Sequence, residues 1–266
     1  MAASSMDVSV CGTHVHCESD GDNNAPKILL LHGWGCDISV MRPVAEQLSS
    51  RFHILSIDFP GHGLSGQPPE PWGVPEFAKC VSDVLKYLKF YPCAVIAHSF
   101  GCRVAAMMAV SENNMITKMI WTGAAGIKQQ LSDNARKKQA KYHRMKKIYE
   151  TIGKARIFSS YSDHMLSRLL KKYGSSDYSS LNDEMRRTFV KVVNLDLIEL
   201  YPQIQQSVLL IWGENDTDTP LWMGKKMDQL ISDSGLVVFE NADHFAYLEQ
   251  LPRFIVIVNK FLEQEH

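Results

Sequence analysis

The chain has no long hydrophobic segment and no strong net charge, and we expect no secretory leader. No run approaches the ~18 apolar residues that a membrane span needs. Residues 1–10 have neither the basic start nor the apolar core of a signal peptide. A formal net charge of −1 gives no global attraction to nucleic acid. We therefore expect a cytoplasmic protein that neither binds nucleic acid nor inserts stably into a membrane.

The six cysteines have no tight metal-ligand spacing. Cys80, Cys93 and Cys102 lie in apolar stretches, where cysteine usually acts as a small hydrophobic residue. Cys11 and Cys17 allow a pairing, but reduced thiols are expected in a chain without an export signal. No phosphate-cradling loop is visible either, so the sequence predicts neither a metal nor a cofactor.

The chain has 266 residues, of which 45% are hydrophobic and 21% charged, ordinary values for a globular protein with a sizeable core. Apolar residues recur at helical spacing near 40–48, with Ser39 as the expected N-cap, and near 77–88, 102–110, 221–231 and 254–261. Continuous apolar runs alternate with these helices, which indicates a parallel sheet covered on both faces. The expected strands are 7–11, 14–18, 27–31, 52–57, 93–97, 117–122, 208–212 and 236–239.

The alternation stops at residues 123–126 and gives way to three helical stripes, at 142–152, 165–173 and 185–193. We predict an α/β core made of residues 1–125 and 207–266. A helical cap of residues 126–206 is inserted after the sixth strand.

The predicted cap is the most basic part of the chain. Between Lys128 and Lys172, thirteen basic residues stand against three acidic ones, a local charge of about +10. Lysine-rich helix faces are usually only solvated. The alternative is attraction to an acidic partner at the cap.

Ser99 lies between an apolar strand and a helix of small residues, in the sequence Ala97-His98-Ser99-Phe100-Gly101. A serine at a sharp strand-to-helix turn presents its hydroxyl to a substrate, and small residues two places to either side let the turn close. Ala97 stands where the usual pattern has glycine. The alternative is that Ser99 only caps the helix that follows it.

A serine nucleophile needs a histidine base, and that base needs a carboxylate. Asp216 and Asp218 follow the strand 208–212, and His244 follows the strand 236–239. These loops leave the carboxyl ends of parallel strands, where open α/β sheets bind ligands. Their order, Ser then Asp then His, is the one expected for α/β hydrolases.

Cysteine offers a second, weaker candidate nucleophile. Cys36 and Cys102 flank the expected site, but neither occupies an elbow.

On these motifs the chain resembles the small, capped, esterase-like members of the α/β-hydrolase family. The resemblance covers nearly the whole chain outside the cap. It depends on five motifs in order, at 32–35 (His-Gly-Trp-Gly), 58–65, 97–101, 212–220 and 243–245, the last followed by Glu249 and Pro252.

The resemblance implies the α/β-hydrolase fold, a mostly parallel, doubly wound sheet with a cap. It implies Ser99 as the nucleophile, His244 as general base and acid, and Asp216 as the orienting carboxylate. The family's Gly-x-x-Asp spacing selects Asp216 over Asp218. The backbone N–H groups of Trp34 and Phe100 would form the oxyanion hole.

Five further residues in these motifs are expected to be structural. His32 and His98 would support their own turns by hydrogen bonds, and His62 lies in a turn that is structural in the family. Asp58 would fix loop backbone. Glu249 would cap the last helix or support its entry.

The expected function is hydrolysis of a carboxylic ester through an acyl-enzyme on Ser99. The substrate would be a small-molecule ester with an apolar acyl or alcohol part. The same triad can instead act on a C–C bond, a lactone or a carrier-protein-bound acyl ester or thioester. Residues 32–35 also resemble the carboxylesterase of biotin synthesis, which acts on a carrier-bound methyl ester. A ligand receptor of the same fold is the remaining alternative.

Overall fold

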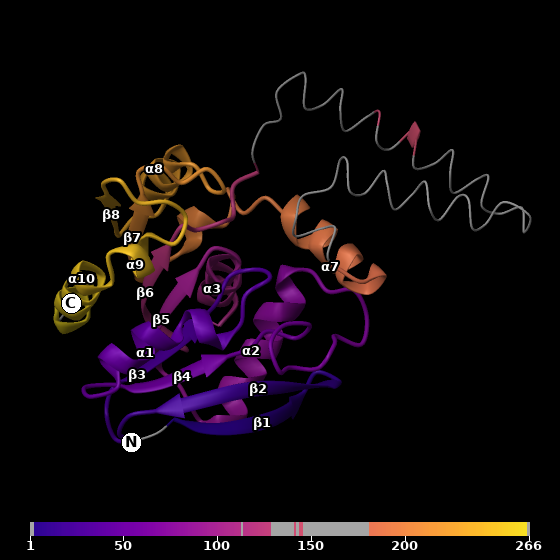
Figure 1. The fold of residues 1–266 in the computed structure, drawn as a ribbon, viewed down its shortest axis with the longest axis horizontal. Coiled ribbons are helices and arrows are strands. Elements are labelled where there is room, and N and C mark those ends of the chain that lie inside the picture. The colour runs from indigo at the N-terminus through magenta and orange to yellow at the C-terminus, as the bar shows by residue number, and fades with distance from the viewer. Residues whose placement is uncertain (1–2, 113, 129–140, 142–143, 146–180, 265–266) are drawn as a thin grey trace, which may run out of the picture. The chain divides into compact units, whose positions relative to one another are not determined.

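The computed structural model describes residues 3–112, 114–128, 141, 144–145 and 181–264 (Figure 1). The chain divides into two compact units, residues 1–127 with 191–266, and residues 128–190. Most of the second unit lies outside the described residues. The predicted boundaries of core and cap, 1–125 with 207–266 and 126–206, therefore stay a prediction.

An eight-stranded sheet forms the larger unit, in the order β1-β2-β4-β3-β5-β6-β7-β8 (Figure 1). β1 and β2 form an antiparallel hairpin, and β2 pairs antiparallel with β4. All the remaining neighbours pair in parallel. The mostly parallel sheet is therefore confirmed. The strands are β1 (Ser4–Val10), β2 (Thr13–Asp20), β3 (Lys27–Leu31), β4 (His53–Ile57), β5 (Cys93–His98), β6 (Ile116–Thr122), β7 (Ser207–Gly213) and β8 (Ser234–Phe239).

Helices cover both faces of this sheet, as expected for a doubly wound fold. Leu29 and Leu31 of β3 belong to one buried cluster, which also holds residues of α2, α3 and α8. Ile28 and Leu30 belong to another, with residues of α1 and α10. Successive strand residues thus point to opposite, equally buried faces, which explains the continuous apolar run. The helices are α1 (Arg42–Leu48), α2 (Val74–Leu88), α3 (Phe100–Ser111), α8 (Leu221–Leu230), α9 (Ala246–Glu249) and α10 (Leu251–Glu263), with short 3₁₀ turns η1 (Ile38–Val40) and η3 (Tyr201–Gln203).

The expected N-cap at Ser39 is wrong. Asp37 is the capping residue, because its carboxylate accepts a hydrogen bond of 2.8 Å from the Ser39 N–H at the start of η1. α1 then begins at Arg42, with a proline in its first turn. Proline suits that position because its missing N–H has no partner inside the helix there.

α7 (Asp183–Asn194) is the third helix expected in the inserted segment. The Asn182 side chain accepts a hydrogen bond of 2.8 Å from the Met185 N–H at the start of α7, and an ion pair of 2.8 Å joins Arg186 to Asp183. The other two helical stripes fall, apart from residues 144 and 145, outside the described residues. None of the helices described is both long and apolar enough to cross a membrane.

Candidate active site

Ser99 occupies a sharp turn between β5 and α3. Its backbone angles are φ 49° and ψ −106°, and a positive φ is costly for a residue with a side chain. The turn is held by hydrogen bonds on both sides: the Ser99 N–H donates to Thr122 O at 3.0 Å, and Ser99 O accepts from the Ala125 N–H at 3.2 Å. The strained geometry is thus enforced by the neighbouring end of β6.

The Ser99 side chain does not cap α3. It makes no capping hydrogen bond to the helix and is partly exposed. Capping was the alternative explanation for a serine at this turn, so the geometry favours a hydroxyl available for chemistry.

Close packing requires glycine on the helix side of the elbow. A Cβ on Gly101 would lie 2.6 Å from Leu31 O and 2.9 Å from His32 O, so α3 is able to approach the end of β3 only with glycine there. Ala97 is fully buried, and its carbonyl accepts a hydrogen bond of 3.2 Å from the Cys102 thiol. The core therefore accommodates the methyl group of Ala97 at the position where the usual pattern has glycine.

Asp216 and His244 form a direct pair. His244 Nδ1 lies 2.8 Å from Asp216 Oδ2. Since a carboxylate only accepts, Nδ1 carries the proton, and Nε2 is left as the basic nitrogen of the ring. Asp218 is exposed and makes no such contact; its N–H instead donates to Asp216 Oδ1 at 2.9 Å. The partner of His244 in the structure is thus Asp216, the residue that the family spacing selects.

Asp216 is kept ionised although it is only 4% exposed. Burial pushes the pKa of this carboxyl upward, but the hydrogen bond and charge of His244, with donors from Thr219, hold the pKa below its usual value. Those donors are the Thr219 N–H to Oδ1 and the Thr219 hydroxyl to Oδ2, both at 2.9 Å. A permanently charged carboxylate is what a histidine base needs to stabilise its cation.

The His244 loop lies against the residues that flank Ser99. The rings of His98 and His244 have centroids 4.7 Å apart. A Cβ on Gly123, which has φ 53°, would lie 3.0 Å from His244 Nδ1. His98 directly precedes Ser99, so Ser99 and His244 are on adjoining loops. Their catalytic roles, like that of Asp216, stay predictions.

His98 is a structural residue, as expected. Its Nδ1–H donates to Thr122 O at 3.1 Å, which fixes the end of β5 to the end of β6. Complete burial, helped by the charge of nearby His244, lowers the pKa of His98 to about 3. The ring is therefore neutral at physiological pH.

The turn that begins at His32 is fixed by the same kind of bond. His32 Nε2 accepts from the Phe59 N–H at 3.0 Å, so the proton lies on Nδ1, which donates to Gly33 O at 2.7 Å. Burial lowers the pKa of His32 to about 4. The Trp34 ring then meets the Phe100 ring edge-on, with centroids 5.3 Å apart.

This contact brings together the two residues expected to form the oxyanion hole. Phe100 is the first residue of α3, where backbone N–H groups have no partner within the helix. Donation from the N–H groups of Trp34 and Phe100 to an oxyanion stays a prediction.

Asp58 fixes loop backbone, as expected. Its Oδ1 accepts from the Ile38 N–H at 2.7 Å, and its Oδ2 accepts from the Leu64 N–H at 2.8 Å. His62 in the same loop donates from Nδ1 to Pro60 O at 3.3 Å. Both residues therefore support the loop that borders Trp34.

Two residues near His244 have positions that the sequence did not reveal. Glu249 was expected at the last helix, but both its carboxylate oxygens lie within 3.2 Å of the Asp243 N–H. It therefore holds the loop that carries His244. Thr219 contacts both Asp216 and His244. The sequence signal for these contacts is the position of Thr219 three residues after Asp216, in Asp216-Thr217-Asp218-Thr219-Pro220.

Of the two cysteines that flank the site, Cys102 is not available as an alternative nucleophile. Cys102 is 1% exposed, and burial raises the pKa of its thiol well above the ordinary value. All six cysteines lie in the described part of the chain, and none of them forms a disulfide there; Cys36 is partly exposed. Among the described residues, no group of three or more His, Cys, Asp or Glu side chains is arranged to hold a metal ion.

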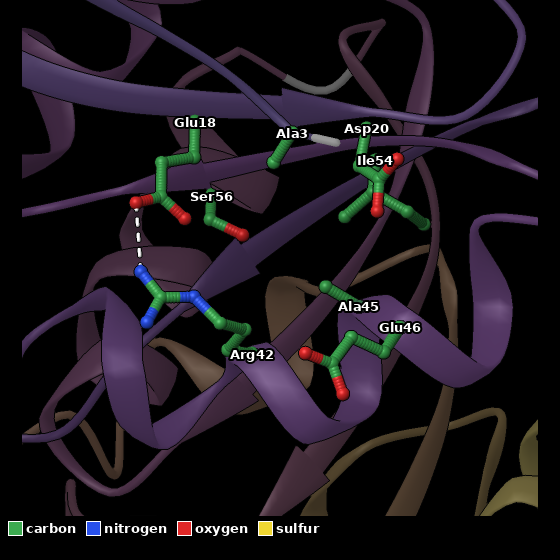
Figure 2. A pocket seen from close by; sticks show the side chains of 8 residues that line it. All are labelled: Ala3, Glu18, Asp20, Arg42, Ala45, Glu46, Ile54 and Ser56. Atoms are coloured by element: carbon green, nitrogen blue, oxygen red, sulfur yellow. Dashed lines mark hydrogen bonds and ion pairs between the residues drawn. The ribbon is translucent and has the colours of Figure 1, made fainter. Parts of the chain in front are cut away.

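A separate acidic pocket of about 360 Å³ lies between α1 and the strands β2 and β4 (Figure 2). Figure 2 shows the Arg42 guanidinium of α1 pointing to Glu18 of β2, with an ion pair of 2.8 Å. No residue expected in catalysis lines this pocket. Its lining residues are Ala3, Glu18, Asp20, Arg42, Ala45, Glu46, Ile54 and Ser56.

Comparison with known proteins extends these findings. The family model described as "Alpha/beta hydrolase family" matches residues 28–256. The pimeloyl-[acyl-carrier protein] methyl ester esterase of Aliivibrio salmonicida is 23% identical over 264 residues, covering 95% of this chain and 97% of the esterase.

Solved structures show the same fold. The enol-lactonase from Burkholderia xenovorans matches with a TM-score of 0.73 at 22% identity, covering 97% of this chain and 100% of the lactonase. A meta-cleavage product hydrolase from Pseudomonas fluorescens matches with a TM-score of 0.72 at 18% identity, covering 97% of each chain. The similarity extends over nearly the full length of each chain.

Proposed function

This chain belongs to the alpha/beta hydrolase family, and from that premise we propose that it hydrolyses carboxylic esters through an acyl-enzyme on Ser99. The observation that carries the proposal is the hydrogen bond of 2.8 Å between Asp216 and His244. The loop that holds His244 adjoins the strained elbow of Ser99. The substrate class is a small-molecule ester with an apolar acyl or alcohol part, and the site of action is the cytoplasm.

The mechanism follows from the positions of the protons. His244 Nε2 accepts the proton of the Ser99 hydroxyl as its oxygen attacks the ester carbonyl, and Asp216 stabilises the imidazolium that forms. The N–H groups of Trp34 and Phe100 bind the negative oxygen of the tetrahedral intermediate, an interaction worth about 3–4 kcal/mol per donor. The imidazolium then protonates the leaving alcohol. Water, deprotonated by His244, hydrolyses the acyl-enzyme.

The test combines turnover with covalent labelling. The wild type should hydrolyse short and medium p-nitrophenyl esters, and Ser99→Ala should lose this activity by a factor of about 10⁴ or more. A fluorophosphonate probe should add one equivalent to the wild type, on the peptide that contains Ser99. Equal turnover by the two proteins, or a label elsewhere, would contradict the proposal. Labelling without multiple turnover on any ester would instead favour a ligand receptor.

A carrier-bound methyl ester is the more specific candidate substrate. It is supported by the pimeloyl-[acyl-carrier protein] methyl ester esterases among the relatives and by the charge of about +10 between Lys128 and Lys172. An acidic carrier protein would be attracted to this segment. The test compares turnover of one methyl ester, free and carrier-bound, at low and high salt. A carrier preference that salt removes would support this candidate.

The same machinery suits other bonds as well. An enol-lactone and a dienoic C–C substrate therefore belong in the panel. A kcat/KM for either of them far above that for the esters would replace the ester as the proposed substrate.

A further inference from the structure

Thr219 lies where three elements of the candidate site meet. It is 6% exposed and belongs to the loop between β7 and α8. Its hydroxyl oxygen is 2.9 Å from Asp216 Oδ2, 3.0 Å from Gly123 O and 3.3 Å from His244 Nδ1. One hydroxyl thus contacts the carboxylate, the imidazole and the end of β6.

The main chain of Thr219 is fixed as firmly as its side chain. Its N–H donates to Asp216 Oδ1, and its carbonyl accepts from Trp212 Nε1 at 2.6 Å. Trp212 is fully buried at the end of β7. The hydroxyl is therefore held in place by a rigid part of the core, which is the condition for orienting another side chain well.

Counting protons shows what the hydroxyl is able to do. It has one proton, while Asp216 Oδ2 and Gly123 O both only accept. It donates to one of them at a time, and its oxygen is then available to accept from the His244 Nδ1–H. The hydrogen bond to Asp216 restricts rotation of the carboxylate, and the contact with His244 restricts tilt of the imidazole.

We propose that Thr219 is a positioning residue that aligns Asp216 with His244 through its hydroxyl. The inference rests on the proposed function, because alignment matters only if His244 acts as a base. The γ-methyl group of Thr219 forms no hydrogen bond and contributes only packing. The isosteric Thr219→Val variant should therefore lose the alignment, and Thr219→Ser should keep it.

The kinetic test compares these two variants with Thr217→Val, a matched control at an exposed threonine of the same loop. Thr219→Val should lower kcat for a p-nitrophenyl ester by between about tenfold and a hundredfold, with KM nearly unchanged. The acid limb of its kcat/KM profile should move to lower pH, because a loosely held carboxylate stabilises the imidazolium less. Thr219→Ser and Thr217→Val should match the wild type.

A second measurement does not depend on turnover. NMR titration of the His244 ring, in a Ser99→Ala background, should show the same downward shift of its midpoint in Thr219→Val and none in Thr219→Ser. Wild-type kcat and an unmoved midpoint in Thr219→Val would overturn the inference, as would a loss in Thr219→Ser equal to that in Thr219→Val. Failure of the proposed function looks different: the wild type itself would neither turn over an ester nor take the fluorophosphonate label. Circular dichroism and thermal melting of each variant identify a folding defect. If Thr219→Val does not fold, Thr219→Ala, which also lacks the hydroxyl, replaces it in both measurements.

Discussion

At the scale of single residues, the candidate site depends on which of two neighbouring aspartates pairs with His244. Asp216 is buried and bonded to the ring, while Asp218 is exposed and contributes only its backbone N–H. We predict that Asp216→Asn lowers kcat on an ester by about 10⁴, because an amide in place of the carboxylate favours the wrong tautomer of His244. Asp218→Asn keeps the backbone donor and should stay within about twofold. Steady-state kinetics of the two variants test this; equal losses would contradict it.

The sequence predicted best the contacts of residues whose place follows from the spacing of a family motif. The Gly-x-x-Asp spacing distinguishes Asp216 from Asp218 without any structure. The contact of Thr219 with Gly123 O was not predictable, because it joins residues 96 positions apart and depends on the register of β6 against β7. The bond from the Asp243 N–H to Glu249, which was expected only to cap the last helix or support its entry, was not predictable for a similar reason, because it depends on the turn between the two residues.

At the scale of secondary structure, α3 has to approach the end of β3 for the elbow to form. We predict that Gly101→Ala lowers the free energy of unfolding by about 1–3 kcal/mol, because the added Cβ would meet two backbone carbonyls that have little freedom to move. Displacement of α3 should also lower ester turnover by about a hundredfold or more. Urea denaturation and kinetics measure the two effects.

The matched control is Gly235→Ala in β8. A Cβ there would meet nothing within 4 Å. Alanine in a strand should be neutral or stabilise by up to about 1 kcal/mol. If Gly101→Ala matched this control in both stability and activity, the close approach of α3 would not be essential to the site.

All eight strands were predicted within a few residues. The clearest were β3, β5 and β7, because strands buried on both faces are nearly continuous apolar runs. Helix starts were predicted less well. α2 begins at Val74 and not near residue 77, since Glu76 bonds back to the Gly73 N–H at 2.7 Å and stabilises one more turn, in which Val74 is also buried. The strand order, with β3 between β4 and β5, follows from packing and is not visible in the sequence.

At the scale of the whole molecule, three buried histidines join the loops that surround the elbow. His32 fixes the turn before Trp34, His98 ties β5 to β6, and His62 lies in the loop after β4. Burial lowers the pKa of His32 and of His62 to about 4, and that of His98 to about 3. The geometry of the site thus depends on three rings that stay neutral in the folded chain well below pH 6.5, where the same rings become charged in the unfolded chain.

This arrangement predicts how stability changes with pH. In the unfolded chain these rings titrate near their ordinary pKa of about 6.5, so below that pH the unfolded state binds more protons than the folded state. The stability is fully present above about pH 6.5 and is lost as the pH falls towards about 4, at up to about 1.4 kcal/mol per pH unit for each histidine. His62→Asn keeps a donor for Pro60 O and removes one titrating ring. The slope of the unfolding free energy against pH should therefore decrease by the contribution of about one bound proton. Urea denaturation of the wild type and of His62→Asn across this pH range measures both slopes. An unaltered slope in His62→Asn would show that His62 is not kept neutral by burial.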